Sequence, residues 1–137
     1  MRFQGAREAM LDRGLAVTAS TCCLAQPDDA AAVGKLLHLK APPDAFLCAN
    51  DITAFSLVKT LGKFKKRVPR DVLVTGIDDV RLAAISSPSL TTVRQPCPDI
   101  AQAAVAAMLQ RLRDPTLPPR QILLDAKLVE RASTRRK

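Results

Sequence analysis

Two short apolar runs, separated by a segment of helix length, constrain the fold of this 137-residue chain more than any other feature. The runs are residues 45–49 and 72–77, and each ends abruptly in polar residues. Runs of this length, bounded by turn-forming residues, are typical of buried strands. Between them, Phe55, Val58 and Leu61 recur at helical spacing, which indicates a helix over residues 52–66. The pattern therefore predicts a strand–helix–strand unit with parallel strands.

Polar side chains follow both predicted strands at the point where each strand ends. Asn50 and Asp51 follow the first strand, and Asp78 and Asp79 follow the second. In open parallel sheets, ligands bind beyond the carboxyl ends of the strands, so these four residues are candidates for a binding site. Asn50 also suits a helix N-cap, and both functions stay open for it. For Asp51 we expect the capping function.

Metal binding and catalysis have little support in the sequence. Asp78 and Asp79 could form a magnesium pair, but no partner acid or phosphate-binding loop accompanies them. The four cysteines show no C-x-x-C spacing and His38 is the only histidine, so we expect no metal site, no cofactor and no hydrolytic enzyme. We expect Cys48 and Cys97 to be structural and His38 to lie on a helix surface. Free cysteines suit a reducing cytoplasm.

The net charge of +8 does not by itself identify a nucleic-acid-binding protein. Basic residues are scattered, with local concentrations only at residues 63–67 and 135–137. A nucleic-acid footprint requires clustering on one face, so we favour a solvated helix end and a terminal tail. With four Phe and no Tyr or Trp, a base-stacking surface is poorly supplied. The sequence contains no secretion signal and no apolar run of membrane-spanning length.

Alternating helical and strand patterns in the rest of the chain indicate an α/β fold. We expect helices over residues 1–13, from Pro27 to before Pro42, and over 98–113, with a short helix or loop over 80–85. Apolar stripes in the first and last of these helices predict one apolar face for each. Strands are expected at 15–23, 90–96, 121–125 and 127–130, and a tail is expected from Ser133 onward.

Four motifs, in order, carry a resemblance to a known family. They are A-F-L-C-A-N-D at 45–51, R-V-P-R-D-V-L-V-T-G-I-D-D at 67–79, P-S-L-T-T-V-R-Q-P at 88–96 and L-L-D-A-K-L-V-E-R-A-S-T at 123–134. Together with R-F-Q-G at the start, they resemble the effector-binding core of LacI/GalR transcription regulators. The resemblance implies a partial periplasmic-binding-protein-like fold, with a parallel sheet flanked by helices and truncated at the N-terminus.

The resemblance also implies a function and a site. In the family, a small molecule binds between two lobes, so we expect a sugar, sugar acid or purine as the effector. By motif, Asn50 and Asp78 are similar to the residues that bond effector hydroxyls, and Arg2 is similar to the arginine that clamps the effector. Gln95 is a weaker candidate, and Arg2 could instead be a frayed terminal charge. We further expect a homodimer, no membrane contact, and DNA contact only through a missing N-terminal domain.

The chain also departs from the family pattern. We expect residues 1–90 to be mainly the carboxy-terminal lobe, 91–118 a remnant of the amino-terminal lobe, 119–134 the closing strands and 135–137 a tail. No aromatic residue occurs near Leu24, where many members stack one on the sugar. A fragment of a periplasmic-type sugar-binding protein and a stand-alone dimerisation module are the alternative functions. Because lead strands are missing, we expect the isolated chain to be marginally stable, oligomeric or aggregation-prone.

Overall fold

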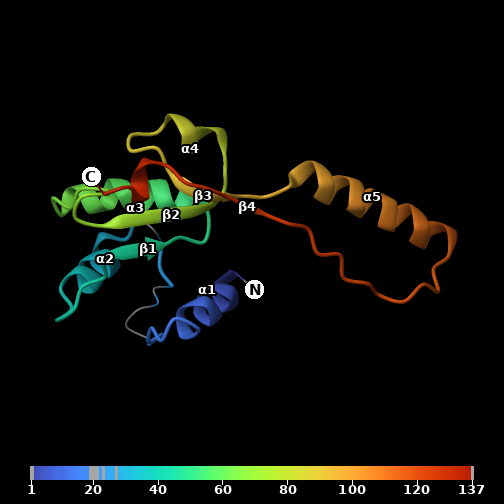
Figure 1. Cartoon of the computed structure of the whole chain (residues 1–137), viewed down its shortest axis with the longest axis horizontal. Helices are drawn as coiled ribbons and strands as arrows, with labels where there is room; N and C mark the ends of the chain where they lie inside the picture. Colours follow the sequence, from blue (N-terminus) through green and yellow to red (C-terminus); the bar gives the residue numbers. More distant parts are fainter. Residues whose placement is uncertain (1, 19–21, 23, 27, 137) are drawn as a thin grey trace.

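A four-stranded sheet forms the centre of the computed structural model, which describes residues 2–18, 22, 24–26 and 28–136 (Figure 1). The strands are β1 (Ala45–Leu47), β2 (Leu73–Asp78), β3 (Thr91–Arg94) and β4 (Lys127–Val129), and they lie in that order in the sheet. The first three are parallel, and β4 runs antiparallel to β3. The predicted strand–helix–strand unit with parallel strands is therefore confirmed.

Five α-helices and one 3-10 helix accompany the sheet in the described residues. They are α1 (Arg2–Leu11), α2 (Ala30–Leu37), α3 (Asp51–Lys63), α4 (Arg81–Ile85), α5 (Cys97–Arg113) and the 3-10 helix η2 (Ala132–Thr134). Local sequence explains where α2 begins, because the Asp29 side chain accepts hydrogen bonds from the Ala31 and Ala32 amides. Within these residues, no helix is both long and apolar enough to cross a membrane.

The core lies between α3 and the strands. Its buried apolar members come from α2, α3, α4, the strands and the loops between them: Val33, Cys48, Ala54, Leu57, Leu61, Val72, Val74, Ala83 and Leu90. Phe64, just after α3, packs so closely on α2 that a Cβ on Gly34 would lie 3.1 Å from its ring. Burial, with a smaller contribution from the charge of Asp51, raises the pKa of the Cys48 thiol to about 12. Cys48 therefore acts as a small apolar core residue, as expected.

Helix α5 lies away from the sheet, as Figure 1 shows. Its 17 residues span about 25 Å at 1.5 Å per residue. None of them is buried, and Leu112 is 72% exposed. Helix α1 likewise buries no residue. Both helices were predicted correctly, and the apolar face of each is left unburied in the described structure.

Three further expectations are corrected by the structure. Residues 121–125 form no strand. The strand expected at 15–23 is absent from residues 15–18 and 22, while 19–21 and 23 lie outside the described residues. The tail expected from Ser133 onward is instead anchored, since the Ser133 hydroxyl donates to the Val74 carbonyl at 2.6 Å and accepts from the Thr91 amide at 2.8 Å. These bonds join residues far apart in the sequence, which local patterns do not reveal.

Candidate functional site

The carboxyl ends of the three parallel strands meet at one edge of the sheet. Asp78 at the end of β2 is in register with Arg94 at the end of β3, and β1 leads through Ala49 to Asn50 at the start of α3. Parallel pairing therefore brings together the polar residues that follow each strand, as the sequence predicted. This edge is the candidate site.

Asp78 is the centre of the site. Its Oδ1 atom lies 3.2 Å from Nη2 of Arg2 and also accepts a hydrogen bond from Nε2 of Gln95. The second Arg2 nitrogen, Nη1, donates to the Ala49 carbonyl at 2.7 Å. Three of the four predicted site residues thus contact one another, and Arg2 is held by two bonds rather than frayed. The Asp78 side chain remains 30% exposed, so a ligand can reach it.

Asn50 lies beside this group and caps helix α3. Its Oδ1 atom accepts a 2.8 Å hydrogen bond from the Thr53 amide, with the backbone extended as an N-cap requires. The capping function that the sequence allowed is confirmed. The same bond leaves the Nδ2 hydrogens as the donors that Asn50 could offer to a ligand. Ligand contact by Asn50 stays a prediction.

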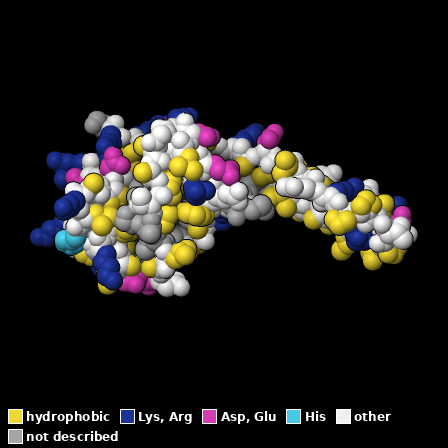
Figure 2. Space-filling model, turned by 90° about the horizontal axis from the view of Figure 1, so that it is seen from below, with side chains coloured by type: hydrophobic (Ala, Val, Ile, Leu, Met, Phe, Trp, Pro, Cys, Tyr) yellow, Lys and Arg dark blue, Asp and Glu magenta, His cyan; other side chains and the backbone are white. Residues whose placement is uncertain are grey.

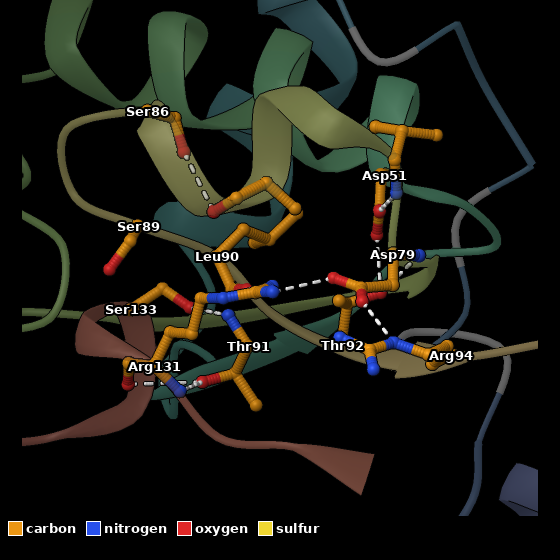
Figure 3. A network of polar contacts seen from close by, with 12 residues as sticks. Asp51, Asp79, Ser86, Ser89, Leu90, Thr91, Thr92, Arg94, Arg131 and Ser133 are labelled. Carbon is orange, nitrogen blue, oxygen red and sulfur yellow. Dashed lines mark hydrogen bonds and ion pairs between the residues drawn. The ribbon is translucent and has the colours of Figure 1, made fainter. Parts of the chain in front are cut away.

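The chain makes a strained corner between Asp78 and Asp79. Their φ angles are 123° and 55°, in the region that non-glycine residues seldom adopt. The two carboxylates consequently point to different partners, since Asp79 bonds Arg94 at 2.6 Å and Arg131 at 2.7 Å (Figure 3). Only 6% of the Asp79 side chain is exposed. Strained backbone is found preferentially at functional sites, which fits the position of this corner.

The electrostatics of Asp79 follow from these partners. Burial alone would raise the pKa of the Asp79 carboxyl, but the hydrogen bonds from Arg94 and Arg131 outweigh it and lower that pKa. Arg131 also donates to the Leu90 carbonyl at 2.8 Å, so the guanidinium joins β2, β3 and the segment after β4. The Asp79 carboxylate therefore links these segments, and its bonds to two arginines leave it unavailable to a ligand.

Asp51 stabilises the Asp78–Asp79 corner through hydrogen bonds made by its buried carboxylate. This fully buried carboxylate accepts bonds from the Thr92 hydroxyl at 2.6 Å and from the Val80 amide at 2.9 Å. Thr92 in turn accepts from the Asp79 amide at 3.3 Å. The expectation that Asp51 caps the helix was wrong: Asn50 is the cap, and Asp51 is bound to the strand ends. One sequence signal was available for this function: Asp51 is an acidic residue that directly follows the N-cap residue of a helix with an apolar face.

These partners argue against a magnesium pair at residues 78 and 79. One carboxylate is bonded to Arg2 and Gln95, and the other to two arginines. No cluster of three or more potential metal ligands occurs among the residues that the structure describes. What the site offers is a carboxylate acceptor, a guanidinium donor and carboxamides that donate and accept, a combination that suits a polyhydroxylated or heterocyclic molecule.

Known proteins resemble this chain in sequence over most of its length. A family model described as a periplasmic binding protein-like domain matches residues 1–134. The ribose operon repressor of Escherichia coli (strain K12) is 33% identical over 102 residues, which cover 74% of this chain and 31% of the repressor. The transcriptional repressor PurR of Photobacterium profundum is 31% identical over 137 residues, which cover 98% of this chain and 41% of PurR.

A solved structure agrees with these sequence matches. The complex of the transcriptional regulator CelR with cellobiose superimposes with a TM-score of 0.82 at 30% identity. The match covers 96% of this chain and 41% of CelR. This chain therefore spans less than half the length of each of these relatives.

Proposed function

Because this chain belongs to the periplasmic binding protein-like domain family of LacI-type transcription regulators, we propose that it is the effector-sensing part of such a regulator. The observation that carries the proposal is the partly exposed Asp78 carboxylate, bonded to Arg2 and Gln95 at the carboxyl edge of the sheet. In this proposal, effector hydroxyls or ring nitrogens replace part of the Arg2–Asp78–Gln95 bonding and engage Asn50. No catalytic step is part of it.

The effector we propose is a sugar, a sugar acid or a purine. Relatives are named for a ribose operon and as PurR, and one structure holds cellobiose. The residues of the site suit such ligands, because carboxylate, amide and guanidinium groups bond hydroxyls and ring nitrogens in fixed directions. Leu24 is fully exposed, and no aromatic side chain is among the bonded residues of the site. Recognition through hydrogen bonds without ring stacking is therefore part of the proposal.

We assign residues 1–90 mainly to one lobe and 91–118 to part of a second lobe. Helix α5 supports this division, because it lies apart from the sheet (Figure 1). It also exposes a row of apolar side chains. These side chains include Ile100, Val105, Met108, Leu109 and Leu112. The effector would bind between the lobes, and lobe closure would shift the regulator between DNA-binding states. In this proposal, a separate domain of the regulator reads the DNA sequence. The regulator acts in the cytoplasm.

We also propose a homodimer. A groove of about 350 Å³ lies between α3 and α4 and the loop after α4, lined by Phe55, Val58, Lys59, Leu82, Ser86, Ser87, Pro88 and Leu90. Apolar side chains beside it are exposed, including Leu82 at 46% and Ile85 at 72%. Two copies of such a surface can bury each other about a two-fold axis. The same groove keeps a stand-alone dimerisation module as the second candidate function.

The experiment is thermal melting of the full chain with ribose, cellobiose, gluconate and a purine base. A ligand that binds only the folded state stabilises it by RT ln(1 + [L]/Kd), so the melting temperature rises with the logarithm of ligand concentration once that concentration exceeds Kd. We expect at least one ligand to raise it for the wild type, and Asp78→Asn to remove that rise. Asp125→Asn changes an exposed carboxylate in the loop before β4 and should leave the rise intact. No rise with any ligand, or an equal rise in Asp78→Asn, contradicts the proposal.

A further inference from the structure

The positive charge of this chain gathers at one end of the molecule, at the edge of the sheet opposite the candidate site. Figure 2 shows several Lys and Arg side chains around the single histidine at this end, and others along the rest of the molecule. The end of α2 meets the end of α3 there, since Gly34 lies against Phe64. The last residues arrive beside the start of β1, where Arg136 donates to the Asp44 carbonyl at 3.3 Å. We call this end the basic pole.

Nine exposed cations make up the basic pole: Lys35, Lys40, Lys63, Lys65, Lys66, Arg67, Arg70, Arg135 and Arg136. Only two carboxylates accompany them: Asp71 lies within residues 63–71, and Asp44 lies at the contact with Arg136. The other described residues carry eleven Lys and Arg against eleven Asp and Glu. The charge asymmetry of the described chain is therefore located at the pole.

Folding accounts for only part of this cluster. Lys35 and Lys63 lie in the last turns of α2 and α3, where a cation offsets the helix dipole. Arg67 forms an ion pair with Asp71 at 3.1 Å. Five other members (Lys40, Lys65, Lys66, Arg70 and Arg135) make no side-chain hydrogen bond or ion pair with any residue that the structure describes. Uncompensated like charges repel one another, so an external anion would be stabilising here.

We infer that the basic pole binds the phosphate backbone of nucleic acid without reading its sequence. Clustered Lys and Arg side chains are the footprint of such binding. None of the exposed large apolar side chains falls in residues 35–41, 63–71 or 135–136. A membrane surface or an acidic protein would normally be held by apolar anchors as well as charge. With no Tyr or Trp in the chain, base stacking is not the means of binding.

The basic pole bears on two expectations from the sequence, one about the charged segments and one about DNA contact. The sequence alone favours a helix end and a tail for the charge concentrations at 63–67 and 135–137, because a footprint needs clustering. The fold brings the described parts of both, residues 63–67 and 135–136, to the same end of the molecule. DNA contact was expected only through a missing domain, whereas the pole is a second, non-specific contact within this chain. It does not depend on effector binding, because the pole and Asp78 lie at opposite edges of the sheet.

The test compares two variants with equal charge changes for binding to a short mixed-sequence DNA duplex. Lys63→Gln/Lys66→Gln/Arg70→Gln neutralises the pole at three exposed positions and leaves the Arg67–Asp71 pair intact. Arg111→Gln/Arg113→Gln/Arg120→Gln makes the same change in exposed residues on and after α5. Fluorescence anisotropy is measured from roughly 50 to 200 mM salt. Phosphatidylserine vesicles are the second probe.

We expect the wild type to bind the duplex with a log–log salt slope that the pole variant lowers by up to about 3. Its affinity at low salt should fall about tenfold or more, while the α5 variant stays close to the wild type. A charge-preserving variant, Lys63→Arg/Lys66→Arg/Arg70→Lys, should retain binding and so separates charge loss from misfolding. Absence of duplex binding at low salt, equal losses in both neutralised variants, or binding to vesicles alone would overturn the inference.

Discussion

The fully buried carboxylate of Asp51 accepts a 2.6 Å hydrogen bond from the hydroxyl of Thr92, 41 residues further along the chain. The same Thr92 hydroxyl accepts the amide of Asp79, and Asp51 also accepts the amide of Val80. The side chains of Thr92 and Asp51 thereby hold the amides of Asp79 and Val80, at and directly after the corner. These bonds hold the backbone directly after Asp78, whose side chain is 30% exposed.

Thr92→Val should destabilise the fold. The substitution leaves Oδ1 of Asp51 and the amide of Asp79 each without a partner, while Oδ2 of Asp51 keeps the Val80 amide, and the cost of such buried groups is about 2 kcal/mol. Urea denaturation monitored by circular dichroism measures the free energy of unfolding. Thr116→Val is the control, because its hydroxyl bonds Asp114 in an exposed loop and its loss should cost about 0.5 kcal/mol or less. Equal losses for the two variants would show that the buried contact is unimportant.

Gly76→Ala should be among the most damaging small substitutions. A Cβ at this position would lie 2.2 Å from Oδ1 of Asp51 and 3.0 Å from Cδ2 of Leu90, so the carboxylate would have to move. We expect a loss of about 3 kcal/mol in the free energy of unfolding. Gly62→Ala in α3 meets nothing within 4 Å and should instead gain about 0.5–1 kcal/mol. A neutral Gly76→Ala would contradict the close packing of Asp51 on β2.

The Asp79 carboxylate should make stability depend on acid. Its folded-state pKa is lowered from 3.8 by hydrogen bonds from Arg94 and Arg131, which outweigh burial. Stability from these bonds is therefore present above the unfolded-state pKa and is lost as pH falls through the lower folded-state pKa. We expect the urea midpoint of the wild type to drop below about pH 4.

Asp79→Asn should remove that dependence. At pH 7 it should cost about 2 kcal/mol, because two charge-assisted bonds are lost and Arg131 is left largely buried. From pH 7 to 3, the variant should then lose less stability than the wild type. Asp71→Asn is the control, since its ion pair with Arg67 is solvent-exposed and contributes little. An unchanged pH profile in Asp79→Asn would refute the role of this carboxylate.

Leu82→Lys should weaken the proposed homodimer. Leu82 is 46% exposed at the groove between α3 and α4, and a charge there would have to be desolvated when two copies meet. Sedimentation equilibrium should show at least a tenfold rise in the dissociation constant. Leu112→Lys makes the same change on α5 and tests whether the apolar arm is responsible for self-association instead. Dissociation caused by Leu112→Lys alone would place the contact on α5.

The sequence was sufficient to predict the parallel strand–helix–strand unit and the gathering of Arg2, Asn50, Asp78 and Gln95 at one edge. Strand periodicity and the geometry of parallel sheets determine both, and the family motifs add Arg2 and Gln95. The role of Asp51 could not be predicted, because its partners are a hydroxyl and an amide in distant segments. Ser133 was misassigned to a tail for the same reason.

The apolar stripe of α5 shows a second limit of sequence reasoning. Its spacing predicts a helix with one apolar face, and the helix is present. Periodicity cannot say what that face packs against, and in the described structure it is exposed. Residues 121–125 failed as a strand on similar grounds, since strand-like composition forms a strand only beside a pairing partner.

Chemical-shift mapping of the 14.8 kDa chain tests the central claim most directly, because it locates a bound effector on the sequence. Amide spectra would be recorded while ribose, cellobiose, gluconate or a purine base is added. We expect a ligand to shift the amide signals of Asn50, Asp78, Asp79 and Gln95, and we expect Asp78→Asn to abolish these shifts. Saturable shifts confined to the groove between α3 and α4, or to the basic pole, would contradict it.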